Sequence, residues 1–168
     1  MEFKEAMKQA LEFEKKGHDI YKEAAEKTNN ALVRKTFSYL AEQETNHIRE
    51  IQEYIDHEHP DIEKIELKGD KLEGAKQFLN TTIKEFREKT ELSEDDIKAH
   101  EAALELEQSA YDFYKEQHDA ANDEKLKTFL KFLMDQENAH FELIQKSLDF
   151  IKDPEHFFAE EEGWLLEG

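Results

Sequence analysis

The sequence contains no cysteine, two prolines and five glycines in 168 residues. Because cysteine is absent, disulfides, thiolate chemistry, iron–sulfur clusters and cysteine-based zinc sites are excluded. The scarcity of proline and glycine, together with 39% charged residues, favours long helices. No apolar run approaches the length that spans a membrane, and the N-terminus has no apolar signal core. We therefore expect a cytoplasmic protein.

Positive charge is scarce as well. The chain has 23 lysines and arginines against 42 acidic residues, which gives a formal net charge of −19. This surplus argues against nucleic acid and membrane surfaces as partners. Most of the glutamate is expected to lie on solvated helix faces. The length suffices for one domain with a sizeable core, and we predict a single domain over residues 1–168.

The sequence repeats itself at one constant offset. A Gln-Glu-x-x-His segment at Gln43–His47 returns at Gln136–His140. The preceding segments keep the same offset, since Leu11–Glu14 matches Leu104–Glu107 and Asp19–Glu23 matches Asp112–Glu116. An ungapped repeat of this length indicates two copies of one supersecondary unit.

Apolar residues recur every three to four positions in both copies, which is typical of helices with one buried face. We predict an all-α four-helix bundle made of two antiparallel helix hairpins, residues 3–57 and 94–152, with internal two-fold repetition. A long crossover, residues 58–93, joins them and contains a short helix from about Leu72 to Lys89. The aromatic tail, residues 153–168, is expected to pack on the bundle or on a second subunit.

Two glutamates lie at equal distances from the predicted turn in each hairpin. Each is about 15 residues, or roughly 22 Å along the helix, from that turn, so the two occupy one level. A histidine follows the second glutamate by three residues and projects from the same face. If the hairpins pack face to face, six side chains converge in the core: Glu14, Glu44, His47, Glu107, Glu137 and His140.

A lone Glu-x-x-His motif usually has no special role, and a single core histidine is more often structural than a ligand. Four carboxylates on buried stripes are different, because each unpaired buried carboxylate costs several kcal/mol. The stripes carry no lysine or arginine near that level. Two divalent metals would supply the missing charge. Carboxylate with imidazole suits iron or manganese, with zinc as a further candidate, and this donor pattern is that of di-iron and di-manganese bundles.

On these residues the chain resembles the rubrerythrin-related, ferritin-like di-iron carboxylate proteins. The resemblance covers both helix pairs and rests on Glu14, Glu44-x-x-His47, Glu107 and Glu137-x-x-His140. It implies a ferritin-like bundle with two iron ions, and it implies that Glu44 and Glu107, or their equivalents, are shared between the metals. It also implies oxidation of the di-ferrous pair by hydrogen peroxide or dioxygen.

The chain departs from the rubrerythrin pattern in two respects. Rubrerythrins carry a cysteine-based rubredoxin module that delivers electrons, so a chain without cysteine needs an external electron donor protein. They also carry an extra glutamate three residues after the ligand of the third long helix. Here that position is Ala110, and its repeat partner is Gly17. The iron movement associated with the extra carboxylate is therefore not implied for this chain.

Three further residues are candidates for contact with the ligands. Tyr21 and Tyr114 lie two turns beyond Glu14 and Glu107, where a hydroxyl could hydrogen-bond a ligand carboxylate from another helix. The alternative is an ordinary core tyrosine. His18 lies one turn after Glu14 and either contacts the ligands or fills space. His100 is interpreted as structural.

The first functional hypothesis is a non-haem di-iron oxidoreductase that reduces hydrogen peroxide or dioxygen with an external electron donor, as a homodimer. The alternative is a ferritin-like protein that oxidises and sequesters Fe(II) without sustained turnover. A third is a redox-silent bundle that holds zinc. An organic-substrate oxygenase is less favoured, because the short chain leaves little room for a substrate cavity.

Overall fold

A computed structural model describes residues 3–56, 72–85 and 93–153. These residues form five helices and no strand, which confirms the predicted all-α class. The helices are α1 (Phe3–Lys27), α2 (Ala31–Asp56), α3 (Leu72–Glu85), α4 (Glu94–Ala120) and α5 (Glu124–Lys152).

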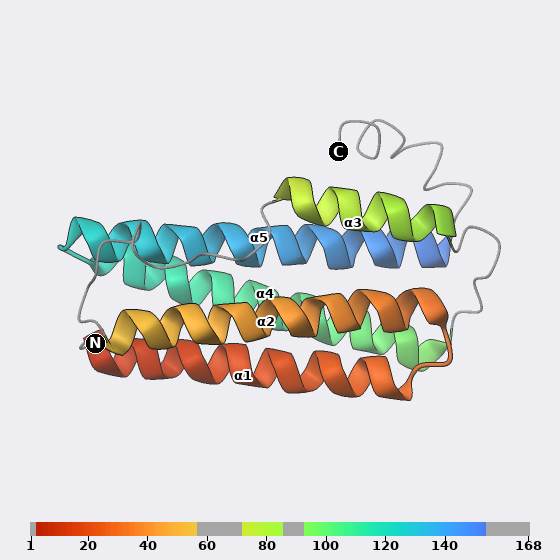
Figure 1. Cartoon of the computed structure of the whole chain (residues 1–168), viewed down its shortest axis with the longest axis horizontal. Helices are drawn as coiled ribbons and strands as arrows, with labels where there is room; N and C mark the ends of the chain where they lie inside the picture. Colours follow the sequence, from red (N-terminus) through yellow and green to blue (C-terminus); the bar gives the residue numbers. More distant parts are fainter. Residues whose placement is uncertain (1–2, 57–71, 86–92, 154–168) are drawn as a thin grey trace.

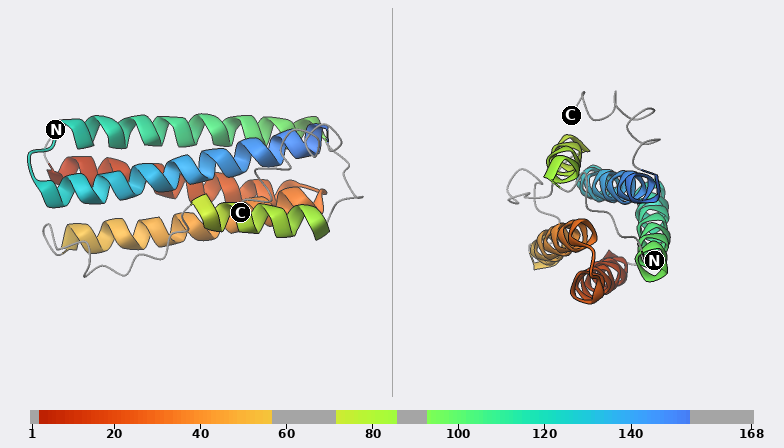
Figure 2. Two further views of the ribbon diagram at one scale, coloured as in Figure 1. Left: turned by 90° about the horizontal axis from the view of Figure 1, so that it is seen from above. Right: turned by 90° about the vertical axis from the view of Figure 1, so that its right-hand side faces the viewer.

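The four long helices form a ferritin-like bundle. α1 and α2 make one antiparallel hairpin and α4 and α5 the other, and Figures 1 and 2 show the two hairpins side by side. Between hairpins, α1 contacts α4 and α2 contacts α5. The predicted connector helix is present as α3, which lies along α5 and also touches α2 (Figure 1). Its residues Leu79 and Ile83 are fully buried.

Polar side chains define both hairpin turns and the start of α4. In the first turn, Asn30 Oδ1 accepts the Val33 N–H at 3.1 Å and so caps α2. In the second turn, Asp123 accepts the Lys125 N–H at 2.9 Å and caps α5. Ser93 and Asp96 form a capping box at the start of α4.

A buried polar network joins the two hairpins near the first turn. The Thr28 hydroxyl donates to Asp96 Oδ1 at 2.6 Å. His100 Nδ1 lies 2.7 Å from the Asp96 carbonyl oxygen, and its Nε2 lies 3.3 Å from Ser147 Oγ. Burial lowers the pKa of His100, so it is neutral in the fold. His100 is therefore a structural residue, as the sequence indicated.

Two apolar clusters occupy the core, one on each side of a polar level. One surrounds Phe37 and Phe150 near the first turn. The other surrounds Met7 and Phe129 at the opposite end. Along α1, the cluster around Met7 ends at Leu11, and the cluster around Phe37 begins at Tyr21. The level between them holds the predicted site.

The rest of the predicted crossover and the aromatic tail from residue 154 lie outside the described residues. No helix in the described ranges is long and apolar enough to cross a membrane.

Candidate metal centre

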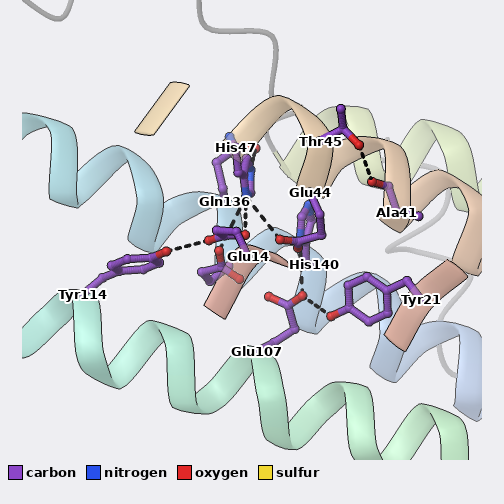
Figure 3. Close-up of polar contacts among 11 residues, drawn as sticks. Glu14, Tyr21, Ala41, Glu44, Thr45, His47, Glu107, Tyr114, Gln136 and His140 are labelled. Carbon is purple, nitrogen blue, oxygen red and sulfur yellow. Dashed lines mark hydrogen bonds and ion pairs between the residues drawn. The ribbon is translucent and has the colours of Figure 1, made fainter. Parts of the chain in front are cut away.

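The fold brings all six predicted ligand residues together at the middle of the bundle. Figure 3 labels Glu14, Glu44, His47, Glu107 and His140. α1 and α4 each supply one glutamate, whereas α2 and α5 each supply one glutamate and one histidine. None of the six residues is more than 2% exposed. They converge because each hairpin turn lies about 15 residues from its two glutamates, which sets the four carboxylates at one level.

The six residues form two overlapping groups of four, and a smaller third group joins Glu44 to both histidines. In each group, one ligand atom per residue lies within 4.8 Å of the others. The His47 cluster consists of Glu14, Glu44, His47 and Glu137. The His140 cluster consists of Glu44, Glu107, Glu137 and His140. Glu44 and Glu137 belong to both. Glu44 and its repeat equivalent, Glu137, are therefore the shared pair, whereas Glu107 belongs to the His140 cluster alone.

Each imidazole directs its Nδ1 at carboxylates. His47 Nδ1 lies 3.2 Å from Glu14 Oε2 and 3.6 Å from Glu137 Oε1. His140 Nδ1 lies 3.3 Å from Glu44 Oε1 and 3.4 Å from Glu107 Oε1. The two rings stack, with centroids 5.1 Å apart and planes 10° from parallel. Two nitrogen donors therefore face one shared set of oxygen donors.

Burial and mutual repulsion dominate the electrostatics of the cluster. Burial, together with the charges of Glu14 and Glu107, raises the pKa of Glu44 and Glu137 well above its usual range. Burial also acts to raise the pKa of Glu14, but the neighbouring His47 holds it well below normal. Burial acts to lower the pKa of His47, and the charge of Glu14 outweighs this and raises it to about 9. Without a cation, protons must offset the carboxylate charge. A bound dication would displace those protons.

The residues present fit a metal. Among the described residues, no lysine or arginine forms an ion pair with the four glutamates. Glu107 Oε2, Glu137 Oε1 and both ring nitrogens of His140 are buried and make no hydrogen bond to any described residue. Buried polar atoms of this kind are uncommon in native proteins, because each costs free energy unless something binds it. Four carboxylates and two imidazoles are also the donors that iron and manganese accept.

Two tyrosines hydrogen-bond the clusters from the opposite hairpin. The Tyr21 hydroxyl donates to Glu107 Oε1, and the Tyr114 hydroxyl donates to Glu14 Oε1 at 2.6 Å (Figure 3). Burial and the nearby glutamate charges raise the pKa of both tyrosines well above normal. Both hydroxyls therefore stay protonated and act as donors. Each ties a glutamate of one hairpin to a helix of the other.

Of the two alternatives for His18, the structure does not show contact with the ligands. Its side chain is 32% exposed, and its Nδ1 faces Asp19 at 3.3 Å. Gly17 is the buried residue at this level of α1. A methyl group there would lie 3.3 Å from Glu44 Cδ and 3.4 Å from Leu106 Cδ2. The Glu44 carboxylate therefore packs directly against Gly17, and the missing side chain makes room for it.

Sequence reasoning missed two residues next to His47. Gln136 is 1% exposed, and its Oε1 lies 3.4 Å from His47 Nε2. The repeated Gln-Glu-x-x-His motif held this signal, since the glutamine recurs with the ligands. Glu50 is fully buried and follows His47 by three residues on the same face. Its signal was a glutamate on an apolar stripe where the repeat has Leu143.

Comparison with known proteins agrees with this architecture. A search of curated proteins finds no match, and a search of solved structures finds none either. The family model described as Rubrerythrin matches residues 5–148, which include all five described helices except the ends of α1 and α5. The match spans most of the chain and contains every residue of both clusters. The protein belongs to the rubrerythrin family.

Proposed function

We propose that the chain is a non-haem di-iron oxidoreductase that reduces hydrogen peroxide or dioxygen with electrons from an external donor. The observation that carries this proposal is the pair of overlapping buried clusters, which offers two metal positions with two shared carboxylates. Membership of the rubrerythrin family supports iron as the metal. A bound pair of ferrous ions would supply the two electrons that, with two protons, reduce hydrogen peroxide to two water molecules.

The chain's own residues would hold and insulate this centre. Glu14 and His47 would complete one position and Glu107 and His140 the other, with Glu44 and Glu137 contributing to both. Tyr21 and Tyr114 would fix the orientation of Glu107 and Glu14. The apolar clusters on either side exclude water, which strengthens every electrostatic interaction within the site. The external donor protein and the homodimer remain predictions.

The test begins with metal content per chain, measured on untagged protein purified without chelators. The protein is then reduced anaerobically, loaded with Fe(II) and mixed with hydrogen peroxide, and its near-ultraviolet absorption is followed. We expect about two irons per chain and a ferric band that grows in as peroxide is consumed. Repeated cycles with an artificial reductant distinguish an oxidoreductase from an iron-sequestering protein, which would stop after one oxidation. Zinc in the site with no absorption change would contradict the redox function.

The tyrosine hydrogen bonds make a separate prediction. Tyr114→Phe removes the donor to Glu14 and leaves the ring, so the carboxylate loses its orientation. We expect metal affinity to fall by about 10- to 100-fold. We also expect the metal-free protein to lose about 1.5–3 kcal/mol of stability, as is typical for a hydrogen bond to a charged group. Metal titration and thermal melting measure the two effects.

Tyr54→Phe is the matched control for this prediction. Tyr54 is also fully buried, but it stacks on Phe129, with ring centroids 4.2 Å apart, rather than contacting the clusters. Its variant should bind metal as the wild type does. An unchanged metal affinity in Tyr114→Phe would show that the hydroxyl only fills the core.

A further inference from the structure

The two metal positions would be equivalent if every residue around them were repeated in both hairpins. The tyrosines are repeated, because Tyr21 donates to Glu107 as Tyr114 donates to Glu14. The ligands are repeated as well, since each cluster of four has one glutamate and one histidine that the other lacks. Differences between the clusters must therefore come from the residues around them.

The two histidines differ in what holds their second ring nitrogen. His47 Nε2 lies 3.4 Å from Gln136 Oε1, which is a carbonyl acceptor in a fully packed environment (Figure 3). This contact favours a proton on Nε2, so Nδ1 is the nitrogen that would give up its proton to Glu14 or solvent and bind a metal in the His47 cluster. His140 Nε2 is buried and makes no hydrogen bond within the described part of the chain. Gln43, the repeat partner of Gln136, is buried too, yet it does not hydrogen-bond His140.

The second difference is one buried charge. Glu50 follows His47 by one helical turn and is 0% exposed, while its repeat partner after His140 is the apolar Leu143. The Arg49 guanidinium lies 3.6 Å from Glu50 Oε1 and offsets part of the Glu50 charge. The Arg49 side chain is more exposed than that of Glu50. A carboxylate near a cation site favours the cation most strongly where water is excluded. The surroundings of His47 are therefore more polar and more negative than those of His140.

We infer that the two metal positions are inequivalent and that the His47 cluster binds its metal first and more tightly, with Gln136 as the residue that positions His47. This inference rests on the proposed metal centre and adds an order of filling to it. A ring whose tautomer and orientation are already set loses less freedom when it binds a metal. The His140 cluster lacks this support and holds the more readily lost ion.

The first experiment locates one metal directly. The metal-free protein is crystallised with one equivalent of Co(II), and anomalous scattering from cobalt shows which cluster is occupied. We expect the signal at Glu14 and His47. In solution, Co(II) titration against a competing chelator should show two steps that differ by about tenfold or more.

The second experiment tests Gln136 with a variant of matched size. Gln136→Met keeps the side-chain length and removes the amide acceptor, and it should weaken the first Co(II) step by about 10- to 100-fold. Gln43→Met is the matched control, since it alters the equivalent residue of the other hairpin. It should leave the first step unchanged. Circular dichroism and melting of the metal-free variants verify that both fold.

Each outcome bears on a different part of the inference. Cobalt at His140, or equally at both clusters, would overturn the order of filling while the metal centre stands. Equal effects of Gln136→Met and Gln43→Met would overturn the role of Gln136. If the wild type binds no cobalt, iron or manganese, the metal centre itself is wrong and the order of filling falls with it.

Discussion

Replacing Glu44 with alanine is expected to reduce bound iron from about two ions per chain to less than one. Glu44 belongs to both clusters, so its removal takes one of four ligands from each position. Glu14→Ala should be milder, because Glu14 belongs to the His47 cluster alone. That variant should keep about one ion at the His140 cluster. Elemental analysis of protein loaded anaerobically with Fe(II) measures both values.

Glu42→Ala is the control for this comparison. Glu42 lies on the same helix, two residues before Glu44, and is exposed. It should keep the full metal content of the wild type. Full occupancy in Glu44→Ala would show that the clusters are not the metal site, and equal losses in Glu44→Ala and Glu14→Ala would show that Glu44 is not shared.

Removing the metal is expected to cause the largest loss of stability. The metal-free centre buries four carboxylates, and burial and repulsion raise the pKa of two of them, Glu44 and Glu137, well above the usual range. A metal that binds the folded chain alone stabilises it by about 4 kcal/mol when its concentration is a thousand times Kd. For a chain of this length that corresponds to a rise in Tm of about 8–16 °C. Thermal melting of the metal-free protein, with and without Mn(II) under anaerobic conditions, measures the shift.

Two controls separate specific binding from general effects of divalent ions. Mg(II) at the same ionic strength should raise Tm much less, because it prefers oxygen ligands and keeps its waters. Glu44→Ala should show no rise with Mn(II) at concentrations that saturate the wild type. A similar rise for Mg(II) and Mn(II) would assign the stabilisation to screening of the chain's net charge of −19 and not to the clusters.

Local rules account for most of the correct predictions. The apolar stripes and the turns act over a few residues, and the outer ends of the two described hairpins lie close to the predicted ones. The level of Glu14 and Glu44 followed from counting residues to the turn, because the rise per residue of a helix is constant. The equality of the two counts, repeated in the second hairpin, made a shared site predictable before any packing was known.

His18 shows where this reasoning fails. One turn after Glu14, its place on the helix was compatible with contact to the ligands, yet its ring faces Asp19 and solvent. The buried residue at that level is Gly17, where the Glu44 carboxylate approaches α1 so closely that an added methyl group would lie 3.3 Å from Glu44 Cδ. A helical period gives the direction of a side chain to within a fraction of a turn. The distance to the neighbouring helix decides which residue fits there.

The helices, the hairpins, the six clustered residues and the level at which they meet could be predicted from the amino-acid sequence, since these follow from helical geometry and an internal repeat. The packed fold was needed to show which carboxylates lie in both clusters, which hairpin each tyrosine reaches and which histidine Gln136 contacts. These contacts join residues far apart in the chain, and they depend on the angle and offset between hairpins. That packing is the sum of many weak side-chain contacts, so no local pattern in the sequence specifies it.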